Sequence, residues 1–221
     1  MKKITKKAAP TSFQQYIRAS NASYEEMDKA VKDELLEALI QEQGGVCAYC
    51  QIKLKTETAT IEHHCERSIC NGLEGKEDRT LDYSNLFAVC PGIAPSKDKK
   101  KQFHCDTQKA TFNSTNGLPM TVCPTNTAHI STIKYSSTGQ LTSSHVDYNG
   151  EMDNILNLNI RHIKDMRKNK WLLFFKYSRG KDKTINTEKM KKLLEKDLTK
   201  TGNHYKNNFP GLSIYLKDKF C

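Results

Sequence analysis

The sequence contains no long apolar run. Hydrophobic residues make up only 37% of the 221 positions and charged residues 27%. No stretch approaches the roughly 20 apolar residues that a membrane helix needs. The first ten residues, MKKITKKAAP, are followed by no apolar segment, so we expect no signal peptide. No internal repeat is visible. We therefore expect a cytoplasmic protein with no membrane partner, of one medium domain or a small domain with additions, and with a modest core.

Acidic residues are fewer than basic ones. The chain has 25 Asp and Glu against 35 Lys and Arg, which gives a net charge of +10. Lysines gather in three runs: KKITKK near the start, KDKKK ending at Lys101, and KMKK at 189–192. Any one run can be a solvated face. The excess over the whole chain favours a polyanionic partner, usually nucleic acid, through phosphate contacts and counterion release.

Cysteine is the residue in clear excess, with eight in all. In a reducing compartment, a cysteine-rich stretch is more often a metal site than a disulfide framework. Cys47 and Cys50 form a C-x2-C after Gly44-Gly45, and such a tight turn directs two thiolates at one ion, which is half of a zinc site.

Two pairs compete for the other half of that site. Spacing alone favours Cys65 and Cys70, which complete C-x2-C-x14-C-x4-C. The rival pair is Cys90 and Cys105. We expect Cys123 and Cys221 to be small hydrophobic residues rather than ligands.

Apolar periodicity predicts a mixed α+β chain, mainly helical around a central core. A helix over 23–43 is indicated by apolar residues at three- and four-residue spacing, a Ser23–Glu26 capping box and a Gly44 stop. Strand-like alternation marks QIKLKT and ETATIEH, and 81–90 predicts a turn followed by a short strand or helix. Further expectations are loops with one helical turn over 91–117, a hairpin over 130–142 turning at Ser137–Gln140, and helices over 153–177 and 187–198.

These elements divide the chain into four predicted segments. They are a helical part (1–45), a metal-binding core (46–112), a loop and hairpin excursion (113–150) and a helical part (151–221), which we expect to form one compact unit.

Residues with hydrolytic chemistry lie in the core. Hydrolysis of a phosphodiester needs a base near neutral pH, which histidine supplies, and a hard divalent cation held by oxygen ligands. Glu62 and His63 end a strand-like run, and Asn85 could orient the imidazole. Asp106 and Lys109 follow within HCDTQK.

The order CAYC, IEH, N, C and CDxxK resembles the HNH nuclease pattern. Longer pieces, over nearly the whole chain, resemble a bacterial PtuB-like family of small HNH proteins found in retron and Septu anti-phage systems. Those pieces are EQGGVCAYCQIKL, TIEHHCERS, LDYSNLFAVCPG, HCDTQKA, ILNLNIRHIKDMR and FPGLSIYL.

The resemblance implies a ββα-metal fold, in which two strands and a helix hold one divalent ion. In that pattern His63 is the general base and Asn85 orients it. Glu62 and Asp106 are then the ligands of a catalytic Mg²⁺ or Mn²⁺.

The resemblance also assigns the structural zinc to Cys47, Cys50, Cys90 and Cys105. This reverses the spacing argument and leaves Cys65 and Cys70 as extra cysteines.

The sequence departs from the family pattern at several positions. Ser68 fits the family's serine, but Glu66 stands in the place of a proline and Asp106 in the place of an asparagine. His104 is an alternative to Asp106 as metal ligand. His64 is either a substrate contact or a buried, satisfied histidine, and with Lys109 it is a candidate nucleic-acid contact.

The family implies a metal-dependent endonuclease that is the effector of an anti-phage system. DNA is the favoured substrate and RNA, including tRNA, the alternative. The implied partners are an ABC/SMC-type, PtuA-like ATPase and, in retrons, a reverse transcriptase with its DNA–RNA product (msDNA). The other interpretation is a non-catalytic zinc-containing module that binds nucleic acid or an assembly partner.

Overall fold

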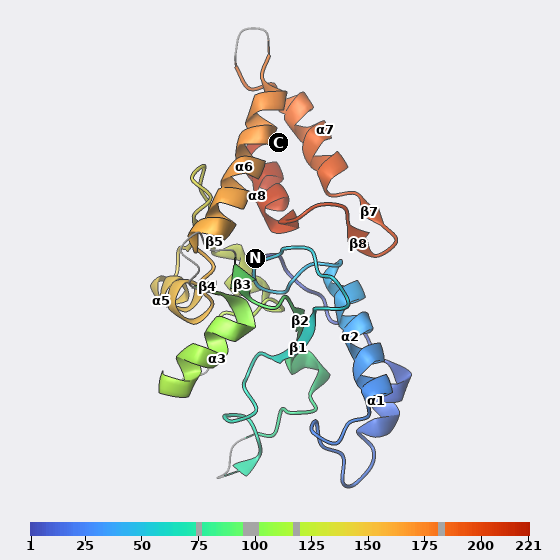
Figure 1. Ribbon diagram of the computed structural model, residues 1–221. Coiled ribbons are helices and arrows are strands. Elements are labelled where there is room, and N and C mark those ends of the chain that lie inside the picture. Colours follow the sequence, from blue (N-terminus) through green and yellow to red (C-terminus); the bar gives the residue numbers. More distant parts are fainter. Residues whose placement is uncertain (74–76, 95–101, 117–119, 181–183) are drawn as a thin grey trace.

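A computed structural model describes residues 1–73, 77–94, 102–116, 120–180 and 184–221. The described chain is a mixture of helices and small antiparallel sheets, the α+β class that the sequence predicts (Figure 1). The α-helices are α1 (Thr11–Tyr16), α2 (Lys29–Gln43), α3 (Cys105–Asn116), α4 (Thr127–Ser131), α5 (Val146–Gly150), α6 (Arg161–Ser178), α7 (Thr187–Asp197) and α8 (Pro210–Phe220). The strands are β1 (Thr60–His63), β2 (Leu86–Val89), β3 (Ile93–Ala94), β4 (Gln102–Phe103), β5 (Ile133–Tyr135), β6 (Leu141–Ser143), β7 (Lys200–Thr201) and β8 (His204–Tyr205).

Strand β2 lies at the centre of the molecule. It pairs antiparallel with β1, so that Glu62 lies opposite Phe87 and His63 opposite Leu86. All four β2 side chains are buried, and because successive strand residues face opposite ways, they divide between two apolar clusters. Leu86 and Ala88 pack with α1 and α2, whereas Phe87 and Val89 join the larger cluster of the cysteines and the C-terminal helices.

Helix α2 begins later than the sequence pattern indicates. The Ser23 hydroxyl does accept a hydrogen bond from the Glu26 amide, at 3.2 Å, but this closes only a turn. The helix begins at Lys29 after an extended Asp28, and it ends at Gly44 in the left-handed conformation, as predicted. A local capping signature does not decide where a helix can pack its apolar face against the core. In this segment the buried apolar residues begin with Met27 and continue with Leu35.

The segment after β2 contains more regular structure than expected. Strands β3 and β4 form a short hairpin, and α3 follows as a helix of 12 residues rather than a single turn. The lysine run ending at Lys101 lies outside the described residues. The strand prediction for QIKLKT is wrong, because only an isolated bridge between Val46 and Lys53 occurs there.

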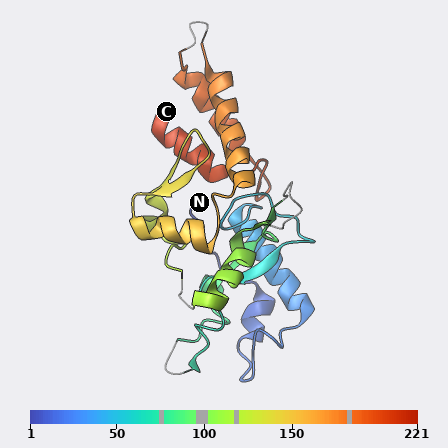
Figure 2. The ribbon, with the colours of Figure 1, turned by 60° about the vertical axis from the view of Figure 1, so that its left-hand side comes forward.

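The C-terminal helices gather at one end of the molecule in both views (Figures 1 and 2). The helix predicted over 153–177 is interrupted: a π-helical turn (Glu151–Ile155) is followed by Asn157 with a positive φ, and α6 begins only at Arg161. Helix α7 and the β5–β6 hairpin confirm their predictions, including the turn that closes with the Gly139 amide on the Ser136 carbonyl. None of the described helices combines the length and apolarity needed to cross a membrane.

Candidate metal centre and catalytic site

Four buried cysteines from three separate parts of the chain converge on one point. Cys47 and Cys50 come from the turn after α2, Cys90 follows β2, and Cys105 begins α3. Their sulfur atoms all lie within 4.8 Å of one another. This is the ligand set that the family resemblance implies, and it could hold a metal ion such as zinc.

The sulfur geometry matches a tetrahedral metal site. Zinc bound at about 2.3 Å to four thiolates in a tetrahedron holds its sulfurs about 3.8 Å apart. The Sγ atoms of Cys47 and Cys105 are 3.8 Å apart, and those of Cys50 and Cys90 are 3.7 Å apart. The donor set of four thiolates is also typical of structural rather than catalytic zinc, because it leaves no open position.

Two unusual backbone conformations build the cysteine cluster. Gln51, directly after the C-x2-C, has φ +65°, and its amide donates to the Cys47 carbonyl at 3.1 Å. Cys105 has φ +52°, and its amide donates to the Leu156 carbonyl at 2.8 Å. Non-glycine residues rarely adopt this region, and such strain gathers at ligand sites.

Burial opposes ionisation of two of the four cysteine thiols. Burial raises the pKa of Cys50 and of Cys105 well above the ordinary thiol value. Hydrogen bonds from the neighbouring thiols of Cys105, Cys47 and Cys50 lower the pKa of Cys90. Because a metal binds the thiolate form of cysteine, a bound divalent ion would offset the cost of burying that charge at Cys50 and Cys105.

The spacing-based choice of Cys65 and Cys70 as zinc ligands is wrong. These two cysteines form a disulfide with each other, across a Cα–Cα distance of 6.0 Å. The expectation of a metal site in preference to disulfides therefore holds for four cysteines of this region and fails for this pair.

His104 lies at the cysteine cluster. Its Nδ1 is 3.1 Å from the Cys105 sulfur and 3.9 Å from the Cys90 sulfur, and its ring is buried. A ring N–H that donates to a thiolate would hold this metal ligand in place. His104 therefore belongs with the four thiols rather than with the candidate catalytic carboxylates.

Two carboxylates meet beside the cysteine cluster. Asp106, in the first turn of α3, is a neighbour of Glu62, at the end of β1. Burial raises the pKa of the Glu62 carboxyl well above its usual value, the Asp106 carboxylate raises it further, and the nearby Lys109 opposes this shift. Two adjacent carboxylates, one buried and one partly buried, offer the oxygen ligands that a hard divalent cation takes.

Lys109 and Tyr49 hold Glu62 from the side away from solvent. The Lys109 ammonium forms an ion pair with Glu62 Oε1 and donates to the His63 carbonyl at 2.6 Å. The Tyr49 hydroxyl donates to the same Oε1 at 3.2 Å. Lys109 is only 1% exposed, so its predicted contact with nucleic acid does not fit this conformation. Tyr49 was not predicted; its place between the two cysteines of the C-x2-C was the available signal.

His63 is held in a single orientation. Its Nε2 is 2.9 Å from the Thr80 carbonyl oxygen, and its ring meets the Tyr24 ring edge-on at 4.5 Å between centroids. A carbonyl only accepts, so Nε2 carries the proton and Nδ1 of the neutral ring is the basic nitrogen. Burial lowers the pKa of His63 to about 4, so the ring is neutral at pH 7.

Asn85 hydrogen-bonds to the backbone close to His63. Its Oδ1 accepts from the Cys65 amide at 2.7 Å, and its Nδ2 donates to the carbonyls of Cys65 and Arg79 at 2.9 and 3.0 Å. These bonds fix both ends of the loop that presents the Thr80 carbonyl to the imidazole. The side chain touches the backbone around His63, not its ring.

His64 faces the opposite side of the sheet from His63. Its ring is buried, 6.0 Å from the Phe87 ring, and burial lowers its pKa to about 3. Its Nδ1 has no hydrogen-bond partner among the described residues. It is thus neither the satisfied core histidine nor the exposed substrate contact that we weighed from the sequence.

The chain was also compared with known proteins. No protein-family model and no curated protein sequence matches it.

Proposed function

We propose that the protein is a metal-dependent endonuclease of the HNH type, which hydrolyses phosphodiester bonds of nucleic acid. The observation behind the proposal is that Glu62 has the carboxylate of Asp106 as a neighbour, and that the next residue along the chain, His63, has its imidazole held by a backbone carbonyl. The order of β1, β2 and α3 around this point, with a four-cysteine cluster alongside, agrees with a zinc-braced ββα-metal element.

In this proposal His63 is the general base. Its Nδ1 takes a proton from the attacking water while Nε2–H stays on the Thr80 carbonyl. The hydrogen bond to that carbonyl strengthens as the ring becomes positive, so the loop held by Asn85 stabilises the product of the proton transfer.

Glu62 and Asp106 would hold Mg²⁺ or Mn²⁺. Such an ion would supply charge stabilisation for the pentacoordinate phosphate and the departing oxygen. Tyr49 and Lys109 both contact Oε1 of Glu62, so they fix the carboxylate. The positive charge of Lys109 thereby reduces the repulsion between the carboxylates of Glu62 and Asp106.

We propose that the enzyme is the effector of an anti-phage system of the Septu or retron type. DNA is the favoured substrate, and cleavage of RNA or tRNA is the alternative. An ABC/SMC-type ATPase, and in retrons a reverse transcriptase with its msDNA, would control it. Co-purification with the ATPase tests the partner, and sequencing DNA and RNA ends after activation of the whole system tests the substrate.

The decisive test compares His63→Ala with His145→Ala, a change at a half-exposed histidine. In a Mg²⁺-dependent cleavage assay of the assembled system, loss of the base should lower the rate about 10²–10⁴-fold. The His145 variant should cut at the wild-type rate. Wild-type cleavage by His63→Ala would overturn the assignment. No cleavage by the intact wild-type system would favour a binding module.

A further inference from the structure

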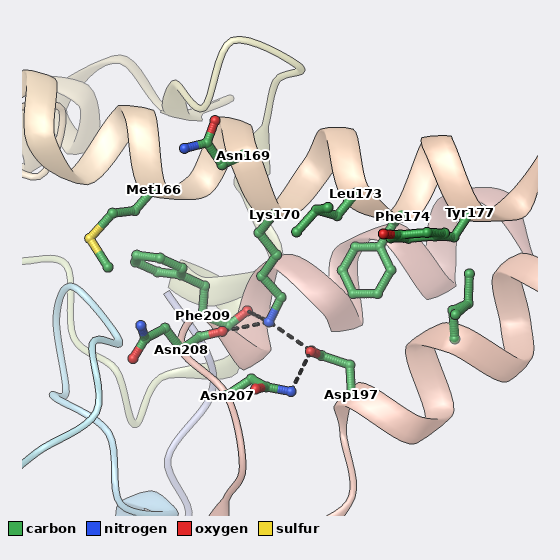
Figure 3. Close-up of a pocket in the computed structure, with 11 residues that line it drawn as sticks. Met166, Asn169, Lys170, Leu173, Phe174, Tyr177, Asp197, Asn207, Asn208 and Phe209 are labelled. Carbon is green, nitrogen blue, oxygen red and sulfur yellow. Dashed lines mark hydrogen bonds and ion pairs between the residues drawn. The ribbon is translucent and has the colours of Figure 1, made fainter.

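A groove with apolar walls runs along α6, far from the candidate catalytic site. It has a volume of about 500 Å³ and lies between α6, α7 and the 207–209 segment (Figure 3). Its walls include Met166, Leu173, Phe174 and Tyr177 of α6, Leu193 of α7, and Phe209. We call it the α6–α7 groove.

The groove exposes apolar side chains that the protein's own core does not cover. Leu173 is 51% exposed and Tyr177 is 61% exposed. Met166, Lys170, Leu173 and Tyr177 recur at three- and four-residue spacing, so they form one stripe along α6. The stripe is about 16 Å long, the length of three turns of an opposing helix.

The polar groups in the groove already satisfy one another. Lys170 forms an ion pair with Asp197 at 2.6 Å and also donates to the Phe209 carbonyl at 3.4 Å (Figure 3). Asp197 accepts in addition from the Asn207 amide at 2.9 Å. A nucleobase edge would find these donors and acceptors occupied, whereas an apolar side chain loses nothing by covering them.

Three lysines flank the groove. Lys176 lies one turn from Leu173 on α6, and Lys189 and Lys196 lie one turn to either side of Leu193 on α7. All three are exposed, and no ion pair is found for them within the described parts of the chain. Of the acidic residues next to these lysines in sequence, Asp197 is paired with Lys170 and Glu195 with Lys217, whereas Glu188 is exposed.

We propose that the α6–α7 groove binds an amphipathic helix of a partner protein, with apolar residues on one face and acidic residues beside them. Leucine or aromatic side chains at three- and four-residue spacing would fill the space over Leu173, Phe174 and Tyr177. Acidic side chains at the edges would meet Lys176, Lys189 and Lys196. This binding surface is independent of the proposed nuclease chemistry.

The test uses a fluorescein-labelled helical peptide with leucines at three- and four-residue spacing and glutamates between them. Fluorescence anisotropy with the full chain should show saturable binding. Leu173→Ser should weaken binding about tenfold or more, since a buried leucine contact is lost. The matched control is Leu172→Ser, because Leu172 is similarly exposed, at 48%, but does not line the groove. It should change affinity less than about twofold.

Two further arms test charge and independence from catalysis. A peptide with lysines in place of the glutamates should bind at least about tenfold more weakly. His63→Ala should bind the acidic peptide as the wild type does, so failure of the nuclease assignment would leave this result unchanged. Circular dichroism confirms that the Leu173 variant is folded.

Several results would overturn the proposal. These are no saturable binding of the acidic peptide, equal effects of Leu172→Ser and Leu173→Ser, or equal binding of the lysine peptide. Two others point to a different occupant. A Leu173-dependent dimer in light scattering would assign the groove to a second copy, and Leu173-dependent binding of a single-stranded oligonucleotide, with none of the peptide, would assign it to nucleic acid.

Discussion

Lys109 shows how one buried charge depends on a partner distant in the sequence. Its ammonium is paired with Glu62, from which it is separated by 47 positions, and lies 3.7 Å from Glu66. Removing one member of a buried ion pair leaves the other charge unpaired, which typically costs about 3–5 kcal/mol.

We therefore expect Lys109→Met to lower the free energy of unfolding by about 3–5 kcal/mol. The double variant Lys109→Met with Glu62→Gln should regain a large part of this loss, because Glu62, the more deeply buried of the two carboxylates beside Lys109, no longer carries an unpaired charge. Urea unfolding of both variants checks this. Equal stability of the single and double variants would show that Glu62 is not left buried and charged.

His64 predicts a pH dependence of stability. Its pKa in the folded protein is about 3, below the ordinary 6.5, so the unfolded chain binds the proton more readily. Above about pH 6.5 the ring is neutral in both states, and His64 does not reduce the free energy of unfolding. As the pH falls from 6.5 towards 3, the unfolded chain takes up the proton first, so the free energy of unfolding decreases.

The free energy of unfolding should therefore decrease less between pH 7 and pH 5 in His64→Phe than in the wild type, by on the order of 1–2 kcal/mol. At pH 7 it should not destabilise the fold, because Nδ1 of His64 has no partner to lose. Urea midpoints at the two pH values give the measurement, with His145→Phe as the exposed control. An unchanged slope in His64→Phe would mean that the ring is charged, or accessible to water, in the folded state.

At the scale of elements, the four-cysteine cluster connects the turn after α2, the end of β2 and the start of α3. Metal binding to such a set contributes directly to folding, because the site does not exist in the unfolded chain. We expect Cys90→Ser to lose zinc and to melt at a lower temperature. Cys65→Ser should keep its zinc, since its sulfur is bonded to Cys70. Metal analysis of the purified variants checks both, and zinc loss in Cys65→Ser alone would contradict the ligand set.

Spacing in the sequence predicted the C-x2-C half of this centre but not the pair of cysteines that completes it. The C-x2-C turn and the glycines before it are short-range features. Cys90 reaches them because β2 passes beside the turn, where the Ala48 amide donates to the Ala88 carbonyl at 3.2 Å. Ligand spacing along the sequence does not describe such a long-range contact, so it favoured Cys65 and Cys70. The family resemblance assigned Cys90 and Cys105 instead.

Element boundaries failed for a related reason. The apolar pattern over 153–177 is continuous, but Asn157 adopts φ +48° and its side-chain amide donates to the Phe103 carbonyl at 2.8 Å. That tertiary contact holds the break before α6. The buried pairing of Lys109 with Glu62, and the contact of Tyr49 with the same carboxylate, escaped prediction likewise, because burial of a lysine becomes favourable only beside a carboxylate from another element.

At the scale of the whole molecule, the net charge of +10 predicts salt-dependent binding of nucleic acid. Each phosphate contact contributes about 0.9 to the slope of log affinity against log salt. With about four contacts, affinity should fall about a hundredfold between 50 and 200 mM salt, with little dependence on base sequence. Anisotropy titrations with labelled duplexes of two unrelated sequences measure this, and salt-independent binding would contradict it.

The same titration separates binding of nucleic acid from binding of the acidic peptide. Because the α6–α7 groove is assigned to a partner helix, Lys189→Glu combined with Lys196→Glu should change the salt slope by less than one contact, about 0.9. The same double variant should strongly lower the affinity for the acidic peptide, since both lysines flank Leu193. Loss of nucleic-acid affinity with a lowered slope, and unchanged peptide binding, would place the phosphates on α7 and remove the charge argument for the groove.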